Sequence, residues 1–233
     1  MKILITGVSS GLGYALAKFA LDAGHEVWGL SRRKPEGLSG NFHFIQGDLE
    51  KLDKIGDSLS VLSGVKNLDY VILNAGILGP VDDVKKSSME GLKLVMDINL
   101  WSNKIIIDYL TDIAEINQVI GISSGASVSG ARGWSGYGIS KAAFNMMIKL
   151  YASEMPGIHF TALAPGLVQT AMQDIISEHK EPEKFPTIQR LQKARGTADM
   201  PQPEEVAARI WDILPKLKSL ESGSYADIRK LEI

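Results

Sequence analysis

Residues 2–13 read KILITGVSSGLG, and this stretch decides the fold. The apolar run over residues 2–5 predicts a buried strand, and a glycine-rich turn follows it directly. A helix is predicted next, over residues 11–23. Such a turn lets the backbone approach a phosphate closely, and the helix dipole favours negative charge there. The same glycines could instead serve only to pack the helix against the strand.

The rest of the chain repeats this alternation, which predicts an α/β fold with a doubly wound parallel sheet. Further strands are predicted over residues 26–30, 42–46, 70–73, 118–122 and 158–163, most of them apolar on both faces. Further helices are predicted over residues 136–155 and 204–217. The length of 233 residues fits a single domain, residues 1–233, better than two small ones.

One segment, at about residues 169–200, interrupts this alternation. It is polar, with prolines at positions 182 and 186 and another just beyond it at 201. Proline ends helices and is confined to the edges of sheets. We interpret the segment as a mobile lid.

Composition excludes several classes of function. The chain has 25 basic and 27 acidic residues with no long block of one sign, so neither nucleic acid nor a membrane is an expected partner. It has no cysteine, and its four histidines lie far apart, so no metal site is expected. The amino-terminal apolar run is too short for a signal peptide, and no run approaches membrane-spanning length. A cytoplasmic protein is therefore expected.

The end of the second predicted strand carries Ser31, Arg32 and Arg33. A dinucleotide site that prefers NAD usually has an acidic residue here, for the ribose hydroxyl. Two arginines instead favour a 2'-phosphate, so the predicted cofactor is NADP(H), with NAD(H) as the alternative. The arginines could also be solvated turn residues.

Tyr137 and Lys141 stand about one helical turn apart, so they share a face of the predicted helix. A tyrosine hydroxyl has a pKa of about 10, and a nearby cation favours its ionised form. Lys141 would thus make Tyr137 a usable acid and base. Taken alone, the pair could equally be a surface feature.

Two other polar positions strengthen this interpretation. Ser124 follows a predicted buried strand, where its hydroxyl could polarise a substrate oxygen, and Asn99 could hold a water that resupplies the proton. Each has a structural alternative: a serine at a strand end often caps a helix, and an asparagine often completes a turn.

Together these residues resemble the single-domain branch of the short-chain dehydrogenase/reductase family, over nearly the whole chain. The resemblance implies a Rossmann fold, a three-layer αβα arrangement. It also implies the following cofactor contacts: Gly7, Ser9, Ser10, Gly11, Leu12 and Gly13 in the turn; Ser31, Arg32 and Arg33; Asp48 and Leu49 near the adenine; Asn74, Ala75 and Gly76; Tyr137 and Lys141; and Pro165, Gly166, Val168 and Thr170 at the nicotinamide.

The family's catalytic tetrad is matched by Asn99, Ser124, Tyr137 and Lys141. The resemblance implies that Tyr137 protonates the substrate oxygen as hydride reaches the carbonyl carbon, and that Lys141 also binds the nicotinamide ribose. There is one departure. Many NADP-binding members have a basic residue where this chain has Ser10, which leaves Arg32 as the main support for NADP(H).

A narrower resemblance is to the sepiapterin reductase and benzil reductase subgroup, which reduces a ketone beside another carbonyl. It rests on residues 133–137 and on the tail at residues 222–227. It implies substrate contacts at Trp134 and Asp227, the latter where a tail aspartate anchors the substrate in pterin reductases. Asp227 could also merely end the last strand.

The sequence therefore predicts a carbonyl reductase that acts on a small-molecule ketone or dicarbonyl. The alternative is a non-catalytic NADP(H)-binding sensor or scaffold with the same fold. A sugar-nucleotide epimerase or dehydratase would need a larger carboxy-terminal region. By family analogy a homodimer or homotetramer is expected, paired through helices at residues 89–113 and 136–155. Leu94, Ile98, Ile105 and Phe144 are either interface or core.

Overall fold

A computed structural model describes residues 1–231. In it a seven-stranded parallel sheet has the order β3-β2-β1-β4-β5-β6-β7. The strands are β1 (Lys2–Thr6), β2 (Glu26–Ser31), β3 (Phe42–Gln46), β4 (Asn67–Leu73), β5 (Glu115–Ile122), β6 (His159–Ala164) and β7 (Ser224–Asp227). The six strands predicted from sequence are confirmed. β7 was not among those six, because four residues with two polar side chains give little strand signal, although it ends at Asp227 as one interpretation of that residue expected.

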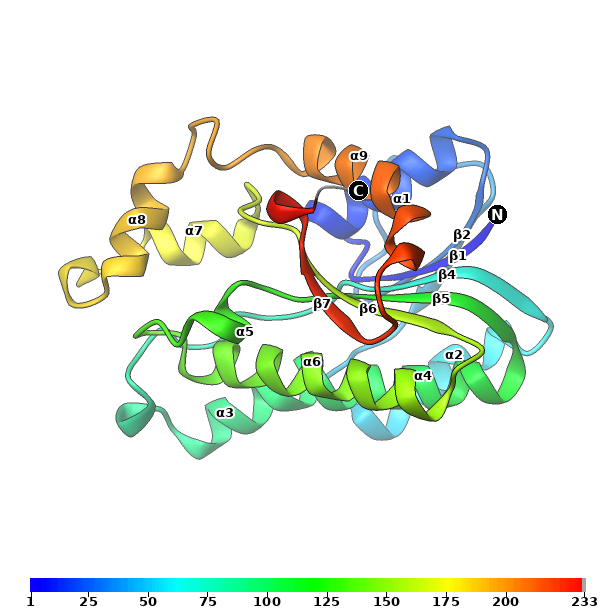
Figure 1. The fold of residues 1–233 in the computed structure, drawn as a ribbon, viewed down its shortest axis with the longest axis horizontal. Helices are drawn as coiled ribbons and strands as arrows, with labels where there is room; N and C mark the ends of the chain where they lie inside the picture. Colours follow the sequence, from blue (N-terminus) through cyan, green and yellow to red (C-terminus); the bar gives the residue numbers. More distant parts are fainter. Residues whose placement is uncertain (232–233) are drawn as a thin grey trace.

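Helices cover both faces of the sheet, which confirms the predicted three-layer αβα fold. They are α1 (Gly11–Asp22), α2 (Ile55–Leu59), α3 (Met89–Met96), α4 (Ser102–Ile113), α5 (Ala126–Ser129), α6 (Ser135–Glu154), α7 (Ala171–Ser177), α8 (Pro186–Ala194) and α9 (Pro203–Ile213). Figure 1 shows α2, α3, α4 and α6 below the sheet and α1 and α9 above it. A π-helical turn (Asp97–Trp101) joins α3 to α4.

The sheet separates two hydrophobic cores. Alternate residues of β1 face opposite sides, so Leu4 packs with the helices of one layer while Ile3 and Ile5 pack with α1 and α9 on the other. This explains why the central strands are largely apolar on both faces, as buried parallel strands are. On the second side the Trp211 indole donates to the Leu16 carbonyl at 3.2 Å, which ties α9 to α1.

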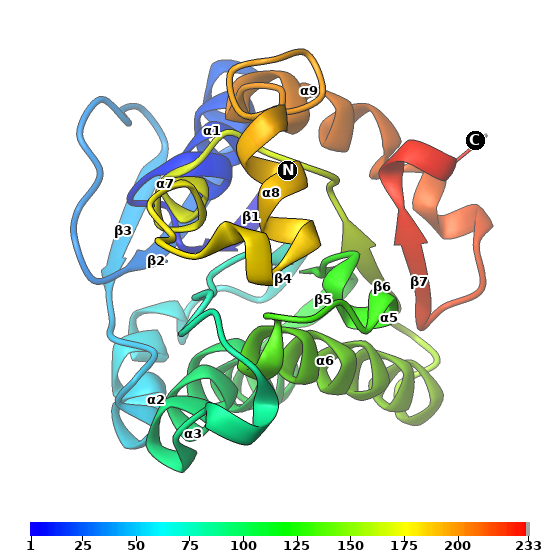
Figure 2. The same cartoon turned by 90° about the vertical axis from the view of Figure 1, so that its left-hand side faces the viewer.

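The segment interpreted as a lid contains the helices α7 and α8. Their apolar side chains form a small separate core, in which Ile176, Ile188 and Leu191 pack with Leu78 from the loop after β4. Figure 2 shows both helices in front of the strands, in the view turned by 90°. The helices arise despite the prolines because Pro186 begins α8, a position where proline loses no hydrogen bond.

Candidate functional site

A cavity of about 1050 Å³ lies at the carboxyl ends of the strands. It runs from the turn after β1 to the end of β7, and residues of α7 and α8 close one side. Ligands of open parallel α/β sheets bind at this edge, where the loops after the strands converge. The cavity is lined by every residue that the sequence analysis assigned to the cofactor or the substrate, with the exception of Arg33. Of the four predicted catalytic residues, only Asn99 lies outside the lining.

The glycine-rich turn leaves no room for side chains at two of its glycines. Gly7 has a φ of +78°, a conformation that other residues rarely adopt. A Cβ atom on Gly13 would lie 2.3 Å from the Gly7 carbonyl oxygen and 2.4 Å from Asn74 Nδ2. Helix α1 then begins after Ser10, whose side chain makes no capping hydrogen bond. Its hydroxyl and the first amides of α1 are thus available to an anion.

The loop after β4 is fixed against this turn. The Thr6 hydroxyl accepts hydrogen bonds from the backbone amides of Asn74 and Ala75, both at 3.0 Å, and Asn74 Nδ2 donates to the Thr6 carbonyl at 2.9 Å. These bonds join the ends of the neighbouring strands β1 and β4. The segment 74–76 therefore forms a fixed wall of the cavity.

The end of β2 contributes Ser31 and Arg32 to the cavity, and the loop after β3 contributes Asp48 and Leu49. Arg33 does not line the cavity. The Ser31 hydroxyl donates to the Arg33 carbonyl at 2.8 Å, which shapes the turn that separates the two arginines. Only Arg32 of the pair is thus placed to meet a ligand.

The loop after β6 closes the other side of the turn. Pro165, Gly166, Val168 and Thr170 all line the cavity. A Cβ atom on Gly11 would lie 3.2 Å from the Thr170 methyl carbon, so this loop reaches the start of α1. The two loops together enclose the space between the turn and Tyr137.

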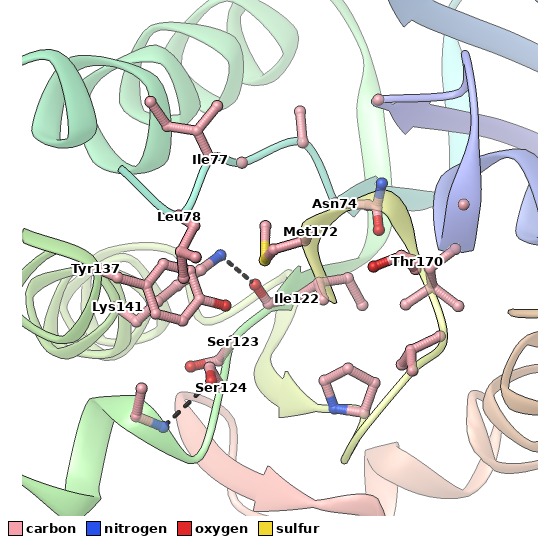
Figure 3. Close-up of a pocket in the computed structure, with 18 of the residues that line it drawn as sticks. Asn74, Ile77, Leu78, Ile122, Ser123, Ser124, Tyr137, Lys141, Thr170 and Met172 are labelled. Atoms are coloured by element: carbon pink, nitrogen blue, oxygen red, sulfur yellow. Dashed lines mark hydrogen bonds between the residues drawn. The ribbon is translucent and has the colours of Figure 1, made fainter. Parts of the chain in front are cut away.

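Tyr137, Lys141 and Ser124 converge at the centre of the cavity (Figure 3). Lys141 is 4% exposed, and its ammonium donates to the Ile122 carbonyl at 2.7 Å. The same nitrogen lies 5.9 Å from the centre of the Tyr137 ring. Helix α6 thus carries the lysine one turn beyond the tyrosine, and β5 holds the ammonium in place.

Burial sets the electrostatics of this group. Removing Lys141 from water disfavours its charged form and lowers its pKa to about 8. Burial also raises the pKa of Tyr137, while a hydrogen bond with Ser124 opposes this shift. The tyrosine is therefore protonated at neutral pH, as a proton donor must be, and the lysine titrates close to the working range of an enzyme.

Asn99 supports this group from outside the cavity. It lies fully buried in the π-helical turn, where its Oδ1 accepts from the Ile77 amide at 2.8 Å. Its Nδ2 donates to the Ile77 carbonyl at 2.9 Å and to the Ser140 hydroxyl at 3.0 Å. Both amide hydrogens are thus used by protein atoms. The side chain therefore positions the loop after β4 and helix α6. A water that resupplies the proton, as the sequence analysis suggested, would have to bind to a group other than the Asn99 amide hydrogens.

The two predicted substrate residues, Trp134 and Asp227, differ in whether another side chain already binds them. Trp134 lines the cavity, with its ring 6.1 Å from that of Tyr137. Asp227 also lines the cavity but is bound to Arg229, whose Nε and Nη2 donate to the two carboxylate oxygens at 2.9 and 2.6 Å. This guanidinium lowers the pKa of Asp227. The aspartate is therefore engaged by Arg229, and its role as a substrate anchor stays a prediction.

Sequence reasoning missed several residues of the cavity. Leu78, Met172 and Ile176 give it an apolar wall beside Tyr137, and Arg229 adds a cation at the end of β7. The apolar residues carry no sequence signal because they lie in irregular or lid segments. The position of Arg229, two residues after Asp227, could have suggested a local ion pair, although such pairs are common.

Residues 1–231 contain neither a metal-binding cluster nor a helix able to span a membrane. No group of three or more histidine, aspartate or glutamate side chains there is arranged to hold a metal ion. None of the helices in this range combines the length and the apolar character that crossing a membrane requires.

Known proteins resemble this chain along most of its length. The family model described as short chain dehydrogenase matches residues 1–181. The benzil reductase ((S)-benzoin forming) of Bacillus subtilis is 29% identical, covering 97% of this chain and 98% of its own length. A benzil reductase ((S)-benzoin forming) of Saccharomyces cerevisiae is also 29% identical, covering 92% of this chain and 90% of its own length.

Among solved structures, the crystal structure of the KRED1-Pglu enzyme superposes with a TM-score of 0.84 at 25% identity, covering 96% of this chain and 99% of that one. The similarity thus extends through the whole sheet and both helical layers.

Proposed function

Because this chain belongs to the short-chain dehydrogenase family, in its benzil reductase-like group, we propose that it is an NADP(H)-dependent carbonyl reductase. Its substrate would be a ketone or dicarbonyl, which it converts to an alcohol. One observation carries the proposal: Ser124, Tyr137 and Lys141 converge on one cavity, and the glycine-rich turn forms another part of its wall. A proton donor and a nucleotide site are thus within one space.

In the proposed reaction the residues of the site transfer one proton, from Tyr137 to the substrate oxygen. A bound NADPH supplies the hydride that reduces the carbonyl carbon. Tyr137 donates its hydroxyl proton to the carbonyl oxygen, which completes the alcohol and leaves a phenolate. Lys141 stabilises that phenolate by its charge, and Ser124 stabilises it by a hydrogen bond. The Ser124 hydroxyl already opposes the rise that burial causes in the pKa of Tyr137.

The residues of the turn fit a dinucleotide. Gly7 and Gly13 leave space that a Cβ atom would fill, and the hydroxyl of Ser10 has no capping partner, as a pyrophosphate site requires. Arg32 supports NADP(H) over NAD(H), because it is exposed beside the end of β2 where the 2'-phosphate is expected. Ser10 supplies no second cation, so NAD(H) stays as the alternative cofactor.

The apolar wall supports an aromatic substrate. Leu78, Met172 and Trp134 line the cavity on the side of Tyr137. Flat aromatic groups bury well against such side chains, and ligand sites are generally apolar with few polar groups. The benzil reductases among its relatives make benzil the first substrate to test.

The proposed assembly is a homodimer or homotetramer, paired through the layer that contains α4 and α6. Ile139, Met146 and Leu150 are exposed on α6 at helical spacing, so they share a face. Leu94 and Trp101 are exposed on the neighbouring segment. A second copy of this chain would cover these side chains. Phe144 is fully buried in the core, so it is not part of that face.

Steady-state kinetics test the proposed activity. The loss of NADPH absorbance is followed with a panel of ketones and dicarbonyls that includes benzil and a pterin. Turnover of panel members by the wild type supports the reductase. Tight binding of NADPH without turnover of any member would instead favour the alternative, a non-catalytic sensor or scaffold.

A further inference from the structure

The guanidinium of Arg229 lies close to Gly125, the residue after Ser124, at the ends of three neighbouring strands. A Cβ atom on Gly125, the residue after Ser124, would be 4.0 Å from Arg229 Nη2. A Cβ atom on Gly166, in the loop after β6, would be 3.1 Å from Arg229 Cδ. Arg229 itself follows β7 and lines the cavity. The side chain therefore crosses from β7 towards the loops that carry the reaction.

Asp227 holds this guanidinium in a fixed orientation. The carboxylate is 8% exposed and accepts from Nε, from Nη2 and from the Arg229 backbone amide. An arginine has five N–H donors, and the pair uses two of them, so three N–H groups stay unpaired by Asp227. The Arg229 side chain is 53% exposed. It can thus donate to a ligand without breaking its ion pair.

We propose that Arg229 recognises the second oxygen of a substrate in which another carbonyl adjoins the reacting one, which makes it a specificity-determining residue for 1,2-dicarbonyl compounds. This inference rests on the proposed reductase function. The reacting carbonyl lies against Tyr137 and Ser124, and the neighbouring carbonyl oxygen accepts a hydrogen bond from Arg229 beyond Gly125.

The ion pair also defines which chemical group fits. Asp227 balances the charge of Arg229, so the pair presents hydrogen-bond donors with little net charge, which suits a neutral carbonyl oxygen. A substrate amine or amide would need the Asp227 oxygens, which Arg229 already occupies. Asp227 therefore acts as a positioning residue for Arg229.

The test uses two ketones that differ only at the second carbonyl. Benzil has it, and deoxybenzoin has a methylene group in its place. The double variant Asp227→Leu, Arg229→Met removes the guanidinium donors, adds no new donor and leaves no buried carboxylate unpaired. Loss of a hydrogen bond from a charged donor predicts a fall in kcat/KM for benzil of about 10- to 100-fold. For deoxybenzoin we expect a change below about threefold.

Lys230→Met is the matched control, because Lys230 is the adjacent cation and also lines the cavity. We expect this variant to alter kcat/KM for benzil and for deoxybenzoin to the same extent, so that the ratio of the two stays at the wild-type value. An equal fall for benzil and deoxybenzoin in the double variant, or no fall for either, would overturn the inference. So would the same selective loss in Lys230→Met, because it would assign the effect to positive charge in the tail.

A binding measurement separates this inference from the proposed function. Calorimetry of both ketones with the enzyme in the presence of NADP⁺ needs no turnover. We expect the wild type to bind benzil more tightly than deoxybenzoin, and the double variant to lose that preference. If Arg229 favours binding of benzil over deoxybenzoin but neither ketone is reduced, the reductase proposal alone is refuted. Turnover without any discrimination by Arg229 would remove this inference alone.

Discussion

The ammonium of Lys141 donates to the carbonyl of Ile122 at 2.7 Å, and this bond ties helix α6 to the carboxyl end of β5. It keeps a cation buried next to Tyr137, where burial lowers the pKa of Lys141 to about 8. The bond explains how a lysine can lie in the cavity wall instead of extending into solvent. It also makes the charge of the site depend on pH in a range that can be measured.

The first prediction concerns stability against pH in the absence of cofactor. The Lys141 side chain loses its proton near pH 8 in the folded protein and near 10.5 in the unfolded chain. Between these values the unfolded chain binds more protons, so stability rises with pH through this window. Urea unfolding should show the wild type gaining free energy of unfolding relative to Lys141→Met from pH 8 to 10.5. A constant difference would show that Lys141 is not buried as described.

The second prediction concerns the glycine-rich turn. A methyl group at position 13 would meet the Gly7 carbonyl and the Asn74 side chain at less than 2.5 Å. Gly13→Ala should therefore destabilise the protein by about 1–3 kcal/mol and weaken NADPH binding. Gly56→Ala in α2 is the control, because nothing lies near its Cβ, and it should stabilise by up to about 1 kcal/mol. Denaturant unfolding distinguishes the two, and equal effects would refute the close packing of the turn.

The third prediction concerns cofactor preference. Arg32 lines the cavity and Arg33 does not, although they are adjacent in sequence. Arg32→Ser should raise the KM for NADPH by about 10- to 100-fold, because a charge-assisted contact with the 2'-phosphate is lost. The KM for NADH should hardly change. Arg33→Ser is the control and should leave both values near those of the wild type. Parity of NADPH and NADH in the wild type would contradict the assignment.

The fourth prediction concerns assembly. Met146 and Leu150 are exposed on one face of α6. Light scattering should give the wild type at least twice the mass of one chain, and Met146→Glu with Leu150→Glu should lower that mass. Ile175→Glu, also at an exposed apolar position but on α7 outside the layer of α4 and α6, should leave the mass unchanged. A wild-type monomer at working concentration would rule out the dimer and the tetramer.

Much of this architecture could be predicted from the sequence, because its signals are local. Strands buried on both faces form uninterrupted apolar runs, and the spacing of Tyr137 and Lys141 is a property of a single helix. The adjacency of Arg32 and Arg33 is also local, but which of them meets the cavity depends on how the turn after β2 is folded. Sequence alone assigned both to the ligand.

Other features depend on contacts between distant segments. The side chain of Asn99 is bound by Ile77 and Ser140, which no spacing rule brings together. The short strand β7 is defined by its pairing with β6. That pairing places Arg229 near Gly125 and next to Asp227, so the ion pair between them could not be predicted as part of the cavity from sequence alone.

The most direct test of the proposed mechanism follows one hydride and one proton. NADPH deuterated at the transferable position of its nicotinamide is mixed with benzil and the wild type or Tyr137→Phe, and the product is analysed by mass spectrometry. We expect benzoin with a single deuterium on its carbinol carbon. We also expect a rate about 100- to 10,000-fold lower in Tyr137→Phe, because a general acid is lost. Product without deuterium, or a variant as fast as the wild type, would contradict the proposed mechanism.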